Sequence, residues 1–109
     1  MASILLALIS APETAGGRQA LALAESLAAA GHRLTVCCLQ DATILGSNRA
    51  PSDARATLDR LLDRVARCLI IVDDLVLRGL AVGERAMTVD RDGIVAALTA
   101  ADDRVVGAF

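Results

Sequence analysis

Apolar residues along this chain fall in short runs separated by polar segments marked by Gly or Pro. The run over residues 3–9 (SILLALI) has the length of a strand, and residues 32–39 (HRLTVCCL) have β-branched residues in their middle. Residues 68–72 (CLIIV) show no apolar/polar alternation, which is typical of a strand buried on both faces. Residues 86–90 and 104–109 predict two more strands.

Helical patterns separate these strands. The Ala/Leu-rich stretch 18–30 follows the loop SAPETAGG and ends at Gly31. After the loop 40–52, apolar residues recur at helical spacing, with arginines and aspartates on the opposite face. These apolar positions are Leu58, Leu61, Leu62 and Val65. We expect Ser52 or Asp53 to cap this second helix.

Two further helices are expected in the last third of the chain. Asp73 or Asp74 is expected to cap a short helix that Gly79 ends, and Asp90 to cap a helix over residues 92–102. Regular alternation of strands and helices requires right-handed crossovers and a mainly parallel sheet. We therefore predict a single domain, residues 1–109, with a three-layer α/β/α fold of flavodoxin-like architecture and a five-stranded parallel sheet.

The amino-acid composition argues against several classes of function. Aromatic residues make up 1% of the 109 residues, so no aromatic stack is present to hold a flavin or nucleic-acid bases. All eleven basic residues are arginines scattered along the chain, and thirteen acidic residues outweigh them, which argues against direct nucleic-acid binding. The lack of lysine excludes Schiff-base catalysis and a phosphate-loop lysine. We expect no cofactor.

The three cysteines, Cys37, Cys38 and Cys68, are an odd number without the spacing of metal ligands. This pattern favours reduced thiols over a disulfide framework, and no metal site is expected. Residues 1–9 lack a basic leader and are too short to span a bilayer. We therefore expect a cytoplasmic protein that does not bind a membrane.

Four segments carry a resemblance to a known family. They are SAPETAGGRQALALAESLAAAGH after the first strand, LQDATILGSN after the second, IIVDDLVLRGL, and the ending DRVVGAF. In order and spacing, over nearly the whole chain, they resemble the DsrE/DsrF/DsrH family of small sulfur-transfer proteins, which includes TusB, TusC and TusD. The resemblance implies five parallel strands and assembly into a hexamer that passes persulfide sulfur between carriers. The pathway, sulfur oxidation or tRNA thiolation, stays open.

The resemblance also implies a position for the working cysteine. In the DsrE/TusD branch it lies near the end of the third strand, and anchoring on Arg78 and Gly79 places Ile71 there, with Val72 as the next choice. The DsrH type has a cysteine in the first helix, whereas residues 18–30 contain none. The chain therefore resembles the family without its usual nucleophile, which suggests an interaction or scaffold subunit.

Such a subunit needs partners. Because 55% of the residues are hydrophobic, part of the surface is expected to be apolar enough to require one. We expect a homo-oligomer, or a hetero-oligomer with DsrE-like paralogues, and contact with a sulfur-carrier protein.

Active sulfur transfer through Cys38 or Cys68 is an alternative. Cys68 begins a strand, at the opposite end of the sheet from the expected cleft. Cys37 and Cys38 are adjacent in a strand, so their side chains are expected to point to opposite faces and not to form one dithiol. Core packing is the preferred interpretation for each thiol, since burial disfavours the thiolate.

Charged residues are expected to gather where the second and third strands end. Asp41, Asp73 and Asp74 should converge there, and such carboxylates would repel an anionic persulfide. His32 lies at the other end of the sheet, too far from the cleft to act as a base.

A third hypothesis is a small-anion or nucleotide-binding module. The loop from Ser10 to Arg18 could cradle an anion with backbone amides at the start of the helix. Its candidate residues are Thr14, Gly16, Gly17 and Arg18. The plainer interpretation is a glycine-rich helix entry without a ligand.

Overall fold

The computed structural model describes residues 2–64, 66–99 and 104–107. Its strands are β1 (Ser3–Leu8), β2 (Arg33–Cys38), β3 (Ala66–Ile71), β4 (Ala86–Val89) and β5 (Arg104–Val106). Its helices are α1 (Ala15–Ala29), α2 (Ser52–Leu62), α3 (Val72–Leu77) and α4 (Arg91–Thr99), with a 3₁₀ helix η1 (Gln40–Ile44) after β2. No helix in these ranges combines the length and the apolar character needed to cross a bilayer.

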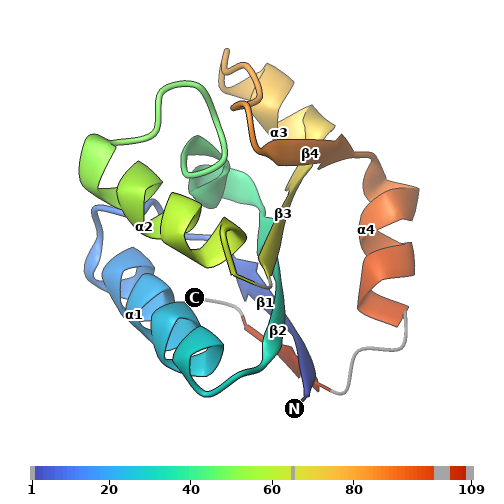
Figure 1. Ribbon diagram of the computed structural model, residues 1–109. Helices are drawn as coiled ribbons and strands as arrows, with labels where there is room; N and C mark the ends of the chain where they lie inside the picture. The colour runs from blue at the N-terminus through green and yellow to red at the C-terminus, as the bar shows by residue number, and fades with distance from the viewer. Residues whose placement is uncertain (1, 65, 100–103, 108–109) are drawn as a thin grey trace.

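The five strands form one sheet in the order β4-β3-β2-β1-β5, and each neighbouring pair is parallel. The chain starts at β1, moves outward to β4, and returns across the sheet to place β5 beside β1 (Figure 1). The predicted three-layer α/β/α fold with a five-stranded parallel sheet is confirmed. Because the strands are parallel, β1, β2 and β3 all end at the same edge of the sheet.

The two faces of the sheet are covered unequally. Helices α1 and α2 pack on one face, and α4 packs on the other (Figure 1). Alternate residues of each strand serve the two layers: Val36 and Cys38 face α1 and α2, whereas Cys37 belongs to the layer under α4. The strands are thus buried on both sides at their centre, as the unbroken apolar runs predicted.

The expected boundaries are close to the observed ones. Strand β3 begins at Ala66 instead of residue 68, and the expected loop 40–52 contains η1. The expected helical position Val65, residues 100–102 of the expected helix 92–102, and residues 108–109 of the last strand lie outside the described residues.

Two of the predicted helix caps are wrong. The N-cap of α2 is Pro51, which has extended backbone angles, so Ser52 and Asp53 already lie in the first turn. The N-cap of α3 is Ile71 without a side-chain bond, because the chain turns directly from β3 into the helix. Asp73 and Asp74 therefore act in the first turn, where a carboxylate favours the positive end of the helix.

Two other helix ends agree with the sequence pattern. Asp90 caps α4, since its Oδ1 accepts a bond of 2.7 Å from the Gly93 N–H. Gly79 ends α3 with φ at 64°, a backbone conformation that side chains disfavour.

The Asp90 cap gives a test of this part of the fold. Asp90→Ala is expected to lower the free energy of unfolding by about 1 kcal/mol, because the Gly93 N–H loses its acceptor. Asp92→Ala, in the exposed first turn of α4, is the control and should cost clearly less. Urea unfolding of both variants measures the difference, and equal losses would contradict the capping role.

Candidate functional site

We call the edge of the sheet where β2 and β3 end the mouth of the fold. One residue there has a strained backbone. Gln40, the first residue of η1, has φ at 51°, and among the described residues it is the only non-glycine with a positive φ. Its N–H donates to Oδ2 of Asp74 over 2.8 Å. This bond ties η1 to α3, so the carboxylate holds in place a backbone conformation that costs energy in most residues.

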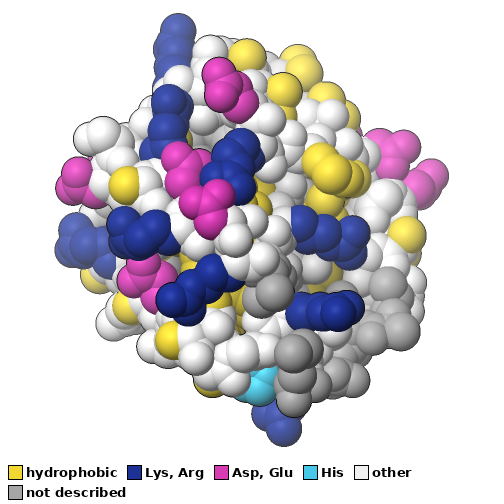
Figure 2. Space-filling model, viewed as in Figure 1, with side chains coloured by type: hydrophobic (Ala, Val, Ile, Leu, Met, Phe, Trp, Pro, Cys, Tyr) yellow, Lys and Arg dark blue, Asp and Glu magenta, His cyan; other side chains and the backbone are white. Residues whose placement is uncertain are grey.

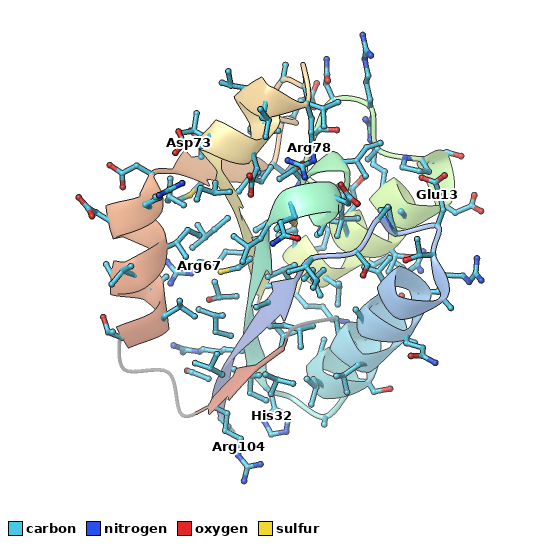
Figure 3. The ribbon with its side chains drawn as sticks, turned by 180° about the vertical axis from the view of Figure 1, so that it is seen from behind. Glu13, His32, Arg67, Asp73, Arg78 and Arg104 are labelled. Atoms are coloured by element: carbon cyan, nitrogen blue, oxygen red, sulfur yellow. The ribbon has the colours of Figure 1, made fainter. Side chains whose placement is uncertain are left out.

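Arg78 joins the carboxylates at this edge. Its guanidinium lies 3.2 Å from Oδ1 of Asp41 and 3.5 Å from Oδ1 of Asp74. Asp73 instead faces Arg91 at the start of α4, at 3.8 Å. In Figure 3, Asp73 and Arg78 lie at the same end of the sheet, with Asp73 on the side of α4.

The expected convergence of three aspartates is thus only partly correct. Asp41 and Asp74 meet through Arg78, while Asp73 lies apart from them. The sequence analysis used Arg78 only to align the third strand and did not foresee its contact with the carboxylates, whose repulsion of an anion its positive charge offsets. The i,i+4 spacing of Asp74 and Arg78 on a helix was a signal that could have revealed it.

Ile71 is the last residue of β3 and the N-cap of α3. Its side chain is buried, with 9% exposed, in the layer that contains Leu5, Cys37 and Ile94. The position at the end of the third strand therefore carries an aliphatic side chain that packs under α4.

The three thiols all lie in the core, each at most 1% exposed. Cys37 and Cys38 point to opposite faces, as predicted. Cys38 and Cys68 share the face under α1 and α2, and their Sγ atoms lie 3.7 Å apart. Sequence reasoning missed this pair, because it depends on the β2–β3 register, in which Cys38 lies opposite Ile70 and Cys68 opposite Val36.

The surroundings of Cys38 disfavour its charged form. The hydrogen-bond contact with Cys68 and complete burial raise the pKa of the Cys38 thiol well above its usual range, although a bond from the Gly46 backbone acts in the opposite direction. Cys38 is thus kept as a neutral thiol at neutral pH.

The loop before α1 has local partners for its polar groups. Thr14 is the N-cap of α1, and its Oγ1 accepts from the Gly17 N–H at 3.1 Å. Arg18 donates to the carbonyl of Glu13 at 2.6 Å. A Cβ at Gly17 would lie 2.0 Å from the Ala11 carbonyl oxygen, so close backbone packing alone accounts for this glycine. Gly16 opens the same helix, next to Ala15.

Other candidate positions lie away from the mouth. His32 accepts from the Ala2 N–H at 3.1 Å, and Figure 3 places it at the opposite end of the sheet from Asp73 and Arg78, as expected. Among the residues that the structure describes, no three His, Cys, Asp or Glu side chains are grouped as a metal site would require.

No family model and no curated protein matches this sequence. Among solved structures, the chain is similar to the crystal structure of the ychN protein from E. coli, with a TM-score of 0.78 and 16% sequence identity. The match covers 97% of each chain. The two chains share one fold, which agrees with the fold that the sequence resemblance implied. At this identity the likeness establishes the fold, and any chemistry has to be argued from the residues.

The mouth of this chain thus combines the Asp41–Arg78–Asp74 network with the buried Ile71 at the end of β3. Strand β3 and the start of α3 provide a rigid frame, since Asp74 connects them to the turn after β2. Among the described residues, the three thiols are buried, and the side chains in contact at the mouth are charged.

Adjacent aspartates test the role of this network. Asp74→Ala is expected to lower the free energy of unfolding by about 1–2 kcal/mol, because the Gln40 N–H and Arg78 both lose a charged acceptor. Asp73→Ala, the matched control, removes one exposed pair at 3.8 Å and should change stability by at most about 0.5 kcal/mol. Chemical denaturation distinguishes them; similar losses at both sites would contradict the network.

The raised pKa of Cys38 predicts a dependence of stability on pH. Below the pKa of an unfolded thiol, about 8.5, both states hold the proton and the stabilisation is complete. Above it the unfolded chain releases the proton first, so the free energy of unfolding falls as pH rises towards the folded pKa. The fall for one thiol is up to about 1.4 kcal/mol per pH unit.

Urea unfolding under reducing conditions between pH 7 and pH 10 measures this fall. Cys38→Ala should show a shallower decline than the unmodified chain over the same range, because one titrating group has been removed. Identical slopes would show that Cys38 is not held neutral by the fold.

Proposed function

We propose that this protein is an interaction subunit of a sulfur-relay assembly of DsrE-like chains and that it does not itself carry sulfur. The observation that supports this most strongly is the burial of all three thiols, each at most 1% exposed. A sulfur carrier must present a thiolate to its donor and acceptor, and these thiols have no open path to either.

The mouth of the fold supports the same proposal. The end of β3, where the resemblance implies the working cysteine, holds Ile71. Cys38, which ends β2 and faces the other layer, is a neutral thiol at neutral pH because its pKa is raised. Neither residue supplies the nucleophile that persulfide transfer needs.

The apolar surface near the mouth favours binding to a partner. Val76 and Leu77 on α3 are 72% and 79% exposed, and Met87 on β4 is 56% exposed. Figure 2 shows hydrophobic side chains gathered over α3 and β4, while arginines and acidic residues gather over α2. Large aliphatic side chains on a short helix are costly to leave in water, and a second protein surface would bury them.

We propose another DsrE-like chain as the partner, either a copy of this one or a cysteine-bearing paralogue. In such an assembly this subunit would supply the contact surface and the paralogue the thiol, with a sulfur-carrier protein as the further partner. The cytoplasm is the proposed location, because reduced thiols without a disulfide persist there. The proposed assembly could act in sulfur oxidation or in tRNA thiolation, and both pathways fit the proposal equally.

The absence of sulfur loading is testable by intact-mass measurement. After incubation of the folded chain with polysulfide, we expect no gain of a sulfur atom that a thiol reductant reverses. A cysteine-bearing DsrE-like chain treated in parallel is the positive control. A reversible gain that Cys38→Ser or Cys68→Ser abolishes would instead support active sulfur transfer by this chain.

The same samples test association. Size-exclusion chromatography should show an oligomer, alone or with the cysteine-bearing chain, and Leu77→Glu should weaken it by placing a charge in the contact. Ala56→Glu, on the exposed side of α2, is the matched control and should leave association unchanged. A chain that stays monomeric in both settings contradicts the proposal.

A further inference from the structure

Exposed apolar side chains are distributed unequally over the two sides of the sheet. No large hydrophobic side chain is exposed on α1 or α2, which cover one side. On the other side, which α4 covers, four large hydrophobic side chains are between 40% and 57% exposed. They are Met87 on β4, Val95 and Leu98 on α4, and Val105 on β5. We call this side of the molecule the α4 side.

The strand register places Met87 and Val105 on the α4 side. Met87 lies opposite Leu69, and Val105 lies opposite Leu5. Residues that lie opposite each other in a parallel sheet point to the same face, and Leu69 and Leu5 both pack in the layer under α4. The exposed apolar side chains of β4, α4 and β5 therefore belong to one side of the molecule.

Helix α4 is apolar on its outer face as well as on its inner face. Ile94 and Ala97 are buried against the sheet, whereas Val95 and Leu98 are exposed. Residues 93–99 include no charged residue. A surface helix normally has polar residues on its outer face, and a helix that is apolar all round is normally covered by other protein. The α4 side thus has the character of a contact surface.

Two arginines lie on the α4 side towards the end of the sheet where the strands begin. Arg67 is opposite Thr35, and its Nε donates to the Thr35 Oγ1 over 3.0 Å. Thr35 is in turn opposite Leu5, and Arg33 precedes Thr35 by two residues, so both arginines point to the α4 side. Figure 3 places Arg67 between the sheet and α4. Among the described residues, no carboxylate lies within ion-pair distance of either guanidinium.

The opposite end of the α4 side, where the strands end, is acidic. Asp90 caps α4 and Asp92 lies in its first turn, while Asp73 on α3 lies 3.8 Å from Arg91. All four side chains are exposed. Three carboxylates and one guanidinium give this end a formal charge of −2 (−3 + 1), against +2 for the two arginines at the other end.

Met87 lies midway between the two charged ends. Its partner Leu69 follows Arg67 by two residues, and Val89, the residue before Asp90, follows Met87 by two. At a rise of about 3.3 Å per residue, Arg67 is about 7 Å below the level of Met87 and Val89 about 7 Å above it. Figure 2 shows hydrophobic side chains over β4 and basic side chains below them, beside α4. The order along the strands is therefore basic, apolar, acidic.

We propose that a second copy of this chain binds the α4 side in the opposite orientation, about a two-fold axis that passes close to Met87. This orientation sets the basic end of each copy against the acidic end of the other and brings the apolar side chains of both copies together between them. The parallel orientation would instead set like charges against each other. The inference rests on the proposed interaction role, because Met87 belongs to the apolar surface described there, and it assigns the α4 side to a copy of this chain.

Reversing the charge of one end tests this contact. Arg33→Glu with Arg67→Glu makes the basic end acidic, and Asp73→Arg with Asp92→Arg makes the acidic end basic. Either doubly substituted chain, taken alone, sets like charges against each other at both ends of the dimer. Its dimer dissociation constant, measured by sedimentation, should therefore rise at least about tenfold over that of the unmodified chain.

Mixing the two doubly substituted chains should restore the contact. In the mixed pair the two reversed ends attract each other, and so do the two unchanged ends. Native mass spectrometry, which separates the species by mass, should show mainly the heterodimer. All four substitutions in one chain should likewise restore a homodimer, and circular dichroism checks that each variant is folded.

The matched control reverses two arginines elsewhere on the surface. Arg49 and Arg64 are exposed and lie just before and just after α2, on the other side of the sheet. Arg49→Glu with Arg64→Glu changes the net charge by the same amount as the substitution of the basic end, and it should leave the dimer dissociation constant unchanged.

Three results would overturn the inference. They are a homodimer that withstands both double substitutions, folded variants that fail to dimerise when mixed, and an equal loss of dimer in the Arg49 and Arg64 control. An unmodified chain that is monomeric alone but binds the cysteine-bearing chain would also overturn it, while the proposed interaction role would stand. A chain that is monomeric in both settings would overturn both.

Discussion

The alternation of side chains along β2 and β3 is the constraint on which the chemistry of this protein depends. In a parallel sheet that is covered on both sides, each residue of a central strand belongs to one of two layers, and both layers are shielded from solvent. This places Cys38 and Cys68 together under α1 and α2, and Cys37 and Ile71 under α4. All three thiols therefore lie in the core, each at most 1% exposed.

At the mouth of the fold, charged side chains hold two elements together. Asp74 accepts from the strained Gln40 backbone and faces Arg78, which also faces Asp41. These contacts fix the turn after β2 relative to α3 and therefore fix the orientation of Val76 and Leu77, which α3 presents to solvent. A rigid helix with exposed aliphatic side chains is well suited to protein contact, because little conformational entropy is lost when a partner binds.

Much of the fold could be predicted from the sequence, because unbroken apolar runs and helical spacing depend on local patterns. Asp90 and Gly79 were predictable for the same reason, since each acts within its own helix end. The caps at Ser52, Asp53, Asp73 and Asp74 were not, because the path of the chain from Pro51 and from Ile71 decides where the helix begins.

The candidate site was harder to predict than the fold. Opposite directions for Cys37 and Cys38 follow from adjacency within one strand, but the Cys38–Cys68 contact depends on the register between strands that are 30 positions apart in the sequence. Arg78 likewise acts on Asp41 across 37 positions. Such pairings are set by tertiary packing, which the spacing of residues along one strand or helix does not encode.

The claim that the fold exposes no reactive thiol is tested most directly by the reactivity of the three thiols in the folded protein. Iodoacetamide added to the reduced, native chain is predicted to modify none of Cys37, Cys38 and Cys68 within minutes, and to modify all three once the chain is unfolded. A thiol that reacts in the native chain as fast as free cysteine would contradict the account, because it would give the fold the exposed nucleophile that we argue it lacks.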